Sequence, residues 1–242
     1  MDSPPKTLLF LEAARGLLEY IQSILLSAPL QFISPRGDGH PVMVFPGLGA
    51  SDTSTRIMRQ MLSNLGYTVY TWGQGRNLGP RDGIDKLTRE LTTRTQEISA
   101  KHGNQKVTLI GWSLGGIYVR EVAKLAPSLV RQVITLGTPF KGQSGATNAT
   151  FLYELLSKDK SHHDPEFVKA LAVKPEVPFT SIYSKTDGVV SWKCSIEEET
   201  DISQNIEVLG ASHVGLGHNP IVLFIVAKLL AQKEDEWELY SK

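Results

Sequence analysis

The amino-acid sequence predicts an α/β fold, with a mostly parallel central sheet flanked by helices and a short cap insertion late in the chain. Short apolar runs rich in β-branched residues alternate with helical patterns of ten or more residues, which is typical of parallel sheets. The chain has 242 residues, of which 41% are hydrophobic, so it can fill one substantial core. No internal repeat or low-complexity linker divides it, and we expect residues 1–242 to form a single domain.

The first elements follow from short patterns bounded by glycine or proline. Residues 41–45 form an apolar run that suits a buried strand. Residues 51–54, Ser-Asp-Thr-Ser, offer N-cap candidates for a helix that ends at about Leu65. A second strand is predicted at 67–71, followed by a longer helix over 81–101.

The alternation continues to the end of the chain with one interruption. The remaining predicted elements are strands at 107–110, 130–136, 179–183 and 206–209 and helices at 114–125 and 221–231. Between them, residues 141–177 hold small polar residues and two short helical patterns, around 151–156 and 165–172. An insertion of this kind often forms a small cap over a site, and we expect a cap here.

The N-terminal residues, about 7–26, predict an amphipathic helix. Glu12, Arg15 and Glu19 fall on one side at helical spacing and leave a broad apolar face. We expect this helix to pack on the body of the protein, and an interfacial membrane helix is the less favoured alternative. The three charges also argue against a signal peptide or a transmembrane span, so a cytoplasmic protein is expected.

Charge and cysteine content narrow the range of partners. The 25 basic and 25 acidic residues cancel, and no basic run stands out, which argues against nucleic acid as the main partner. The single cysteine, Cys194, cannot form an intramolecular disulfide or a cysteine-rich metal site. We expect a small neutral ligand and leave the oligomeric state open.

Two patterns are similar to cofactor-binding or metal-binding motifs, but each lacks residues that such binding requires. Residues 73–79 resemble a dinucleotide fingerprint, but the third glycine is one residue late and no acidic ribose ligand follows. We expect this segment to be a loop that lines the cleft. The pair His162-His163 lacks further ligands at helical spacing and is expected at the surface. No cofactor and no metal are therefore predicted.

Residues 111–115, Gly-Trp-Ser-Leu-Gly, join a predicted strand to a predicted helix and carry the strongest chemical signal. A serine hydroxyl is a weak nucleophile that needs exposure to a base, and a sharp strand-to-helix turn provides it. Glycines two positions before and after the serine avoid a clash within that turn. Ser113 is therefore the predicted nucleophile.

A serine nucleophile also needs a base and an acid that orients the base. Asp187 follows the strand predicted at 179–183, and carboxylates at the carboxyl ends of parallel strands point into the ligand crevice. Its rival, Asp201, has no clear strand before it. His213 follows the next strand and can accept the serine proton at neutral pH, with His218 as its rival. We predict Asp187 and His213.

The tetrahedral intermediate of acyl transfer requires N–H donors for its oxyanion. Leu114, directly after the nucleophile, is predicted to provide one. Residues 46–50, after the first strand, are glycine-rich and let the backbone approach a substrate, and Leu48 is the second predicted donor. Trp112 and Trp192 lie beside predicted catalytic residues and either form an aromatic wall or simply pack.

The chain resembles the α/β-hydrolase superfamily, in particular its lipases and esterases, in the motif around Ser113 and in the order serine, aspartate, histidine. The likeness covers about residues 41–231. It implies that residues 136–140, Leu-Gly-Thr-Pro-Phe, precede a lid and that the insertion shapes an acyl pocket. Lipases of this type carry a His-Gly pair at the oxyanion loop, where this sequence has Pro46-Gly47, so no role of a histidine is carried over.

The predicted function is hydrolysis of carboxylic esters, of small molecules or lipids, through an acyl-enzyme on Ser113. An acyltransferase or a thioesterase would use the same groups and differ in the acyl acceptor or the leaving group. A binding module that has lost turnover is the alternative from another class. The presence of all three predicted catalytic residues argues against such a module.

Overall fold

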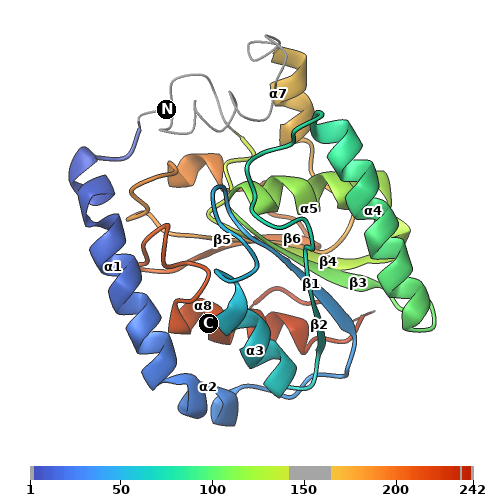
Figure 1. Ribbon diagram of the computed structural model, residues 1–242, viewed down its shortest axis with the longest axis horizontal. Helices are drawn as coiled ribbons and strands as arrows, with labels where there is room; N and C mark the ends of the chain where they lie inside the picture. The colour runs from blue at the N-terminus through green and yellow to red at the C-terminus, as the bar shows by residue number, and fades with distance from the viewer. Residues whose placement is uncertain (1–2, 142–164, 235, 241–242) are drawn as a thin grey trace.

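The computed structural model describes residues 3–141, 165–234 and 236–240 of the chain (Figure 1). These residues contain a six-stranded sheet in the order β2-β1-β3-β4-β5-β6, in which each neighbouring pair is parallel. The strands are β1 (Pro41–Phe45), β2 (Thr68–Thr71), β3 (Val107–Trp112), β4 (Val130–Leu136), β5 (Phe179–Tyr183) and β6 (Ser203–Glu207). The predicted parallel sheet is confirmed.

Helices cover both faces of this sheet, as predicted. They are α1 (Lys6–Leu25), α2 (Ser27–Ile33), α3 (Arg56–Asn64), α4 (Ile84–Lys101), α5 (Leu114–Leu125), α7 (Pro165–Ala172) and α8 (Pro220–Leu230). Successive side chains of a strand point to opposite faces, so Val42 and Val44 pack in one cluster with α3 and α8, whereas Met43 and Phe45 pack with α4 and α5. Two separate apolar cores therefore hold the sheet between its helices.

The structure adds one helix and shifts several predicted boundaries: α4 begins at Ile84, β3 runs on to Trp112 and β6 ends at Glu207, and two further shifts have a clear cause. Helix α3 begins at Arg56, because the polar residues before it form turns in which the Ser54 N–H donates to the Ser51 carbonyl. Strand β6 begins at Ser203, because pairing with β5 extends it over buried polar residues; the Gln204 side chain, for example, donates to Thr180. A short helix, α2, follows α1 and was not predicted.

The predicted cap at 141–177 is described only in part. Residues 142–164, which include the helical pattern at 151–156 and the pair His162-His163, lie outside the described residues. The second helical pattern is α7, in which Leu171 is buried in the core that contains α5. The cap therefore stays a prediction.

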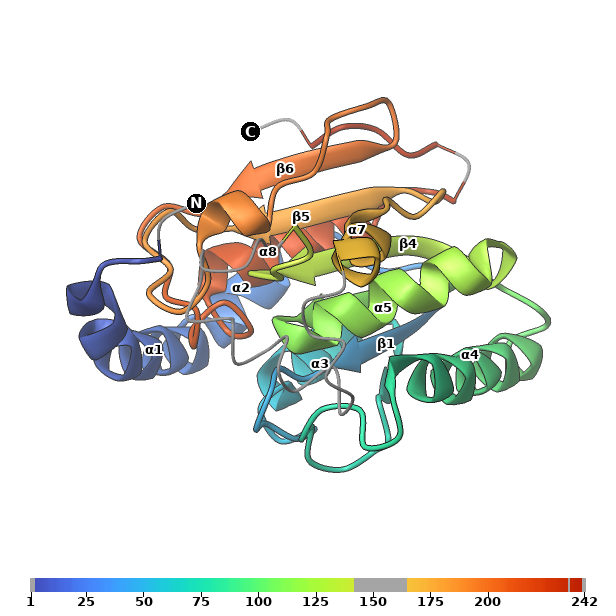
Figure 2. The ribbon, with the colours of Figure 1, turned by 90° about the horizontal axis from the view of Figure 1, so that it is seen from above.

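Helix α1 packs on the body through its polar side, which corrects the expected orientation. Glu12 and Glu19 are buried, at 4% and 6% exposed, while Phe10 and Leu25 on the apolar side are 85% and 72% exposed. The helix lies beside the carboxyl ends of β5 and β6 (Figure 2), where loop N–H groups offer partners to its carboxylates. Hydrogen bonding to those loops, not burial of apolar area, decides which side of α1 faces inward.

Candidate active site

Ser113 occupies a strained turn between β3 and α5. Its φ is 52°, a value that non-glycine residues rarely adopt and that costs about 1–3 kcal/mol. Two hydrogen bonds hold the turn: the Ser113 N–H donates to the Leu136 carbonyl at 2.8 Å, and the Thr138 hydroxyl donates to the Ser113 carbonyl at 3.0 Å. The neighbouring strand β4 and the residues after it therefore fix the serine in place.

Both glycines of the motif are required by this turn. A Cβ on Gly111 would lie 2.4 Å from the Cα of Gly116, and one on Gly115 would lie 2.7 Å from the carbonyl oxygens of Phe45 and Pro46. A side chain at either position would have to displace backbone. The predicted clash within the turn is confirmed for Gly111, whereas Gly115 is required by the close approach of the residues at the end of β1.

The structure brings Asp187 and His213 to Ser113 on the loops after β5 and β6. The His213 Nε2 atom lies 3.0 Å from Ser113 Oγ, and Nδ1 lies 2.6 Å from Asp187 Oδ2. The second oxygen of Asp187, Oδ1, accepts the N–H groups of Val189 and Val190 at 2.8 and 2.7 Å. A serine hydroxyl is activated as a nucleophile when it is hydrogen-bonded to a base that a carboxylate holds in orientation, and this is the arrangement here.

The pKa of His213 lies above its ordinary value of 6.5. Burial lowers this pKa, but the charge of Asp187, its hydrogen bond and the charge of Glu12 together raise it by more. When the ring is neutral with its proton on Nδ1, Nε2 is free to accept the serine proton. The same carboxylate then stabilises the imidazolium that forms.

Leu48 and Leu114 both present backbone N–H groups that have no acceptor among the described residues. Leu114 is the first residue of α5, where the helix dipole adds partial positive charge. Gly47, beside Leu48, comes so close to Ser113 that an added Cβ would lie 3.3 Å from the serine Cβ. The loop after β1 therefore reaches the nucleophile, and the role of both N–H groups as oxyanion donors stays a prediction.

Asn77 holds the loop after β1, a role that sequence reasoning missed. Its side-chain amide donates to the Pro46 carbonyl at 2.9 Å and accepts the Tyr118 hydroxyl at 3.2 Å. Its backbone N–H donates to the Ala50 carbonyl at 2.8 Å, and its carbonyl accepts the Gly49 N–H at 2.7 Å. The glycine-rich loop after β2 thus supports the loop after β1 through one buried asparagine.

The rival acid and base lie outside this array. Asp201 is exposed and precedes β6, so it sits at the amino ends of the strands, opposite to the edge that carries Ser113. His218 donates its Nε2 proton to the Gly16 carbonyl at 3.1 Å, and its ring stands edge-on to Trp112. Burial lowers the pKa of His218, as for a packed neutral imidazole.

The two tryptophans pack in different ways. The Trp112 indole N–H donates to the His213 carbonyl at 3.0 Å and so supports the loop of the candidate base. Trp192 stacks on Tyr183, with ring centroids 5.9 Å apart. The structure therefore favours packing for both side chains over an aromatic wall.

Glu12 of α1 links the loop of the candidate acid to the loop of the candidate base. Its Oε1 accepts the Gly188 N–H at 2.7 Å, and its Oε2 accepts the Val214 N–H at 2.9 Å. Gly188 directly follows Asp187, and Val214 directly follows His213. One buried carboxylate therefore fixes the spacing of the two loops. Sequence reasoning missed this contact because it joins residues 176 and 202 positions apart.

Glu19, two turns further along α1, holds the base loop at a second point. Its carboxylate accepts the Ser212 N–H at 3.1 Å, the Ser212 hydroxyl and the Asn219 side-chain amide, the last at 2.7 Å. Between the two carboxylates, Arg15 donates to the Thr186 carbonyl at 2.8 Å. The polar side of α1 is thus part of the framework that positions Asp187 and His213.

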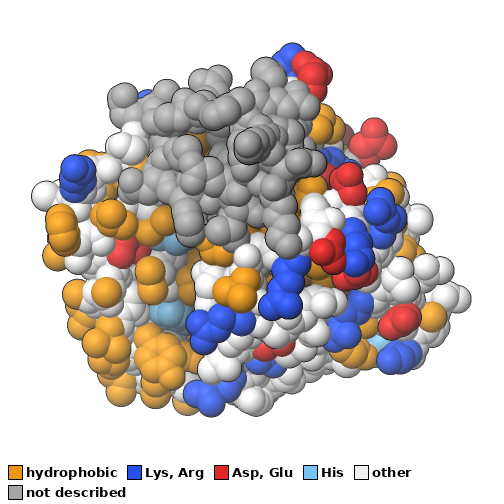
Figure 3. Space-filling view, turned by 45° about the horizontal axis from the view of Figure 1, so that its top comes forward, with side chains coloured by type: hydrophobic (Ala, Val, Ile, Leu, Met, Phe, Trp, Pro, Cys, Tyr) orange, Lys and Arg blue, Asp and Glu red, His pale blue; other side chains and the backbone are white. Residues whose placement is uncertain are grey.

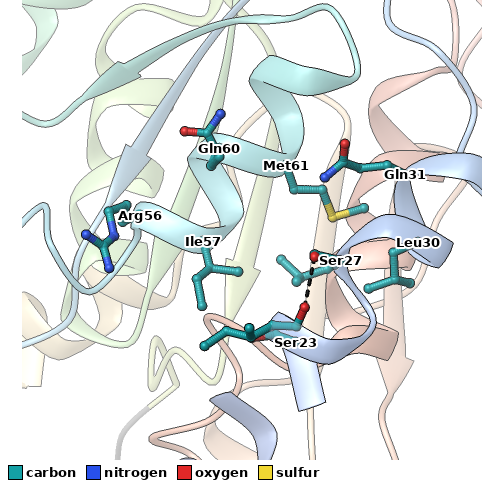
Figure 4. A pocket seen from close by; sticks show the side chains of 10 residues that line it. Ser23, Ser27, Leu30, Gln31, Arg56, Ile57, Gln60 and Met61 are labelled. Atoms are coloured by element: carbon teal, nitrogen blue, oxygen red, sulfur yellow. Dashed lines mark hydrogen bonds between the residues drawn. The ribbon is translucent and has the colours of Figure 1, made fainter. Parts of the chain in front are cut away.

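A pocket of about 380 Å³ lies between α1, α2, α3 and α8 (Figure 4). Its walls combine apolar side chains such as Ile24, Leu30 and Met61 with polar ones such as Ser27 and Arg56. No predicted site residue lines it, and its lining holds no histidine, carboxylate or cysteine for acid–base chemistry. Among the described residues, no group of three or more histidine, cysteine or carboxylate side chains could hold a metal ion.

The chain is similar to known thioesterases and lipases. A family model for palmitoyl protein thioesterase matches residues 41–190, more than half of the chain. Triacylglycerol lipases of Pseudarthrobacter phenanthrenivorans and Burkholderia plantarii are each 31% identical over 126 residues, 50% of this chain. The matched part spans only 38% and 34% of the length of these two relatives.

A solved structure supports the same fold. The mature lipase BlEst2 of Bacillus licheniformis superposes with a TM-score of 0.60 at 18% identity, covering 82% of this chain and 95% of that chain. At this identity the likeness extends to the fold alone.

Proposed function

The chain belongs to the palmitoyl protein thioesterase family and is a lipase/esterase-like α/β-hydrolase, and on this basis we propose that it hydrolyses carboxylic esters through an acyl-enzyme on Ser113. The observation that carries the proposal is the continuous hydrogen-bonded array of Ser113, His213 and Asp187. It stands at a strained strand-to-helix turn, beside the N–H groups of Leu48 and Leu114, which have no acceptor among the described residues.

In the first half-reaction, Ser113 Oγ attacks the acyl carbon while its proton passes to His213 Nε2. The N–H groups of Leu48 and Leu114 donate to the oxyanion, and each such donor is worth about 2.7–4 kcal/mol of barrier. Asp187 stabilises the imidazolium. The intermediate collapses as the bond to the leaving group breaks, and His213 returns its proton to that group, which leaves the acyl chain on Ser113.

In the second half-reaction, water takes the place of the departed group. His213 accepts a proton from the water as its oxygen attacks the acyl-serine carbon. The second tetrahedral intermediate releases the carboxylic acid, and the proton on His213 returns to Ser113 Oγ. Bonds and protons balance over the cycle with only ester and water consumed, so the proposed reaction calls for no cofactor.

Thioester hydrolysis is the second candidate function, and the family match to palmitoyl protein thioesterase favours it. The same array would act on both substrates, because the leaving group differs only in having sulfur instead of oxygen. An acyltransferase would differ in the second half-reaction, where an alcohol replaces water. A binding protein without catalytic turnover would not need the hydrogen-bonded set of Ser113, His213 and Asp187.

The test pairs active-site labelling with matched substrates. We expect a fluorophosphonate probe to label Ser113, and a chain without turnover would leave the probe unreacted. Rates on p-nitrophenyl esters from acetate to palmitate, with and without emulsion, would then be compared with rates on acyl thioesters of the same chain lengths. Faster turnover of the thioesters would establish the second candidate. Ester products from added alcohol would establish transfer.

Activity is expected to fall on the acid side with a midpoint above pH 6.5, because His213 must be neutral to accept the serine proton and its pKa is raised. The Glu12→Gln variant removes one charge that raises this pKa and leaves one loop N–H without an acceptor. We expect the midpoint of kcat/KM against pH to move to lower pH and the plateau to fall about tenfold.

The matched control is Glu97→Gln, an exposed carboxylate on α4. It should leave both the midpoint and the plateau unchanged. A Glu12→Gln variant with the wild-type midpoint and plateau would show that Glu12 does not position the loops of Asp187 and His213.

A further inference from the structure

Helices α1 and α2 present many apolar side chains to the outside of the molecule. Of the 18 large hydrophobic side chains that are exposed among the described residues, 11 fall in residues 9–33. The most exposed of these 11 are Phe32 at 90%, Phe10 at 85% and Leu25 at 72%. Figure 3 shows these side chains gathered over α1 and α2. We call this surface, made by the exposed apolar side chains of residues 9–33, the apolar face.

The orientation of α1 inverts the usual rule for a helix on the surface of a globular protein. Such a helix normally buries its apolar side and exposes its polar side. Here the polar side is held by Glu12, Arg15 and Glu19, and the close approach to the body leaves no room for a side chain at Gly16, where a Cβ would lie 2.8 Å from Val214. The apolar face is therefore held outward by specific hydrogen bonds, and a concentration of exposed apolar side chains of this kind marks an interaction surface.

The charges around the apolar face match an anionic surface. Between residues 3 and 36 the only carboxylates are Glu12 and Glu19, and both are buried against the body. Lys6 is exposed at the start of α1, whereas beyond α2 the exposed Arg36 donates to the Asn64 carbonyl and is followed by the exposed carboxylate of Asp38. Residues 3–33 therefore combine exposed apolar side chains with one exposed lysine and no exposed carboxylate, which suits the interface of a bilayer that contains anionic lipids.

We propose that the apolar face docks on a lipid bilayer with anionic headgroups, with α1 lying in the plane of the interface. No single helix of the described residues is long and apolar enough to cross a membrane. Helices α1 and α2 together meet the length and composition that a membrane span needs, but a 62° bend separates them. The face is mainly leucine and isoleucine, whereas protein interfaces concentrate their binding energy in tryptophan, tyrosine and arginine. The composition therefore favours lipid over a second copy of the chain.

Docking in this way places the candidate active site at the membrane. The same helix that carries the apolar face holds the loops of Asp187 and His213 through Glu12. If the proposed function holds, the ester substrate would be reached at the bilayer surface. The docking itself does not depend on catalysis, and the Ser113→Ala variant is expected to bind vesicles like the wild type.

Sedimentation with vesicles tests the proposal on the full chain. We expect binding to phosphatidylcholine vesicles that contain about 30 mol% phosphatidylglycerol to exceed binding to phosphatidylcholine alone by roughly fivefold, since Lys6 is exposed at the start of α1. The Phe10→Ser/Phe32→Ser variant should bind about 100-fold more weakly, because each lost phenylalanine is worth about a factor of ten or more.

The control variant is Leu125→Ser/Val173→Ser, which removes two apolar side chains, 55% and 57% exposed, from the region of α5 and α7. It should bind as the wild type does, and circular dichroism should show that all variants stay folded. Absence of binding to both vesicle types, or binding that survives Phe10→Ser/Phe32→Ser, would overturn the proposal. So would a dimer in light scattering without lipid that the same two substitutions dissociate, because the occupant would then be a second copy.

Discussion

The Ser113→Ala variant is expected to lose acyl-ester turnover by a factor on the order of 10⁵ while keeping its fold. The substitution removes the only atom that can form the acyl-enzyme in the proposed mechanism. It leaves the backbone unchanged, because the bonds that hold the turn involve the Ser113 N–H and carbonyl and not the hydroxyl. Initial rates on p-nitrophenyl butyrate and thermal unfolding by circular dichroism would measure the two effects separately.

The matched control for this variant is Ser63→Ala, an exposed serine on α3. It should retain full activity and full labelling by a fluorophosphonate, whereas Ser113→Ala should lose the label. Near-normal turnover by Ser113→Ala would remove the basis of the proposed function and leave the vesicle-binding proposal untouched.

The second large effect is expected for Asp187→Asn, with a fall in turnover of about 10⁴. Asp187 uses Oδ2 for His213 and Oδ1 for two loop N–H groups, so all its contacts are with donors. An asparagine must turn its own NH2 group toward one of these donors. Either the loop loses its bonds, or His213 is driven to the tautomer whose Nε2 cannot accept the serine proton.

Asp201→Asn is the comparison that decides the assignment of the acid. Asp201 is exposed and precedes β6, far from the carboxyl ends of the strands. Its loss should change turnover by less than about twofold, as for most surface substitutions. A severe loss in Asp201→Asn with little effect in Asp187→Asn would reassign the acid.

Local patterns were enough to predict the strands and helices around the nucleophile. The predicted helix at 114–125 and the predicted strands at 130–136 and 179–183 match α5, β4 and β5 residue for residue. In a parallel sheet the loops after successive strands meet at one edge, so sequence order alone could place Ser113, Asp187 and His213 near each other. The structure brings those three side chains within hydrogen-bond distance.

Strand β6 shows where such patterns fail. Its first residues, Ser203 and Gln204, are polar yet buried, at 0% and 5% exposed, and they are ordered by pairing with β5 and by side-chain bonds. Hydrophobic periodicity cannot detect a strand that is held by its neighbour. Asn77 was missed for the same reason, since its partners lie in a loop that only the folded chain brings close.

The sequence by itself determined the fold class, the turn that exposes Ser113 and the order of the residues that reach it, because each of these rests on local sterics and on strand direction. Only the tertiary structure decided how α1 is turned. Hydrophobic periodicity shows that a helix has a polar and an apolar side, but it does not show which side packs against the rest of the protein. The N–H groups of the loops after β5 and β6 require acceptors once buried, and Glu12 and Glu19 supply them, which leaves the apolar face of the helix outside.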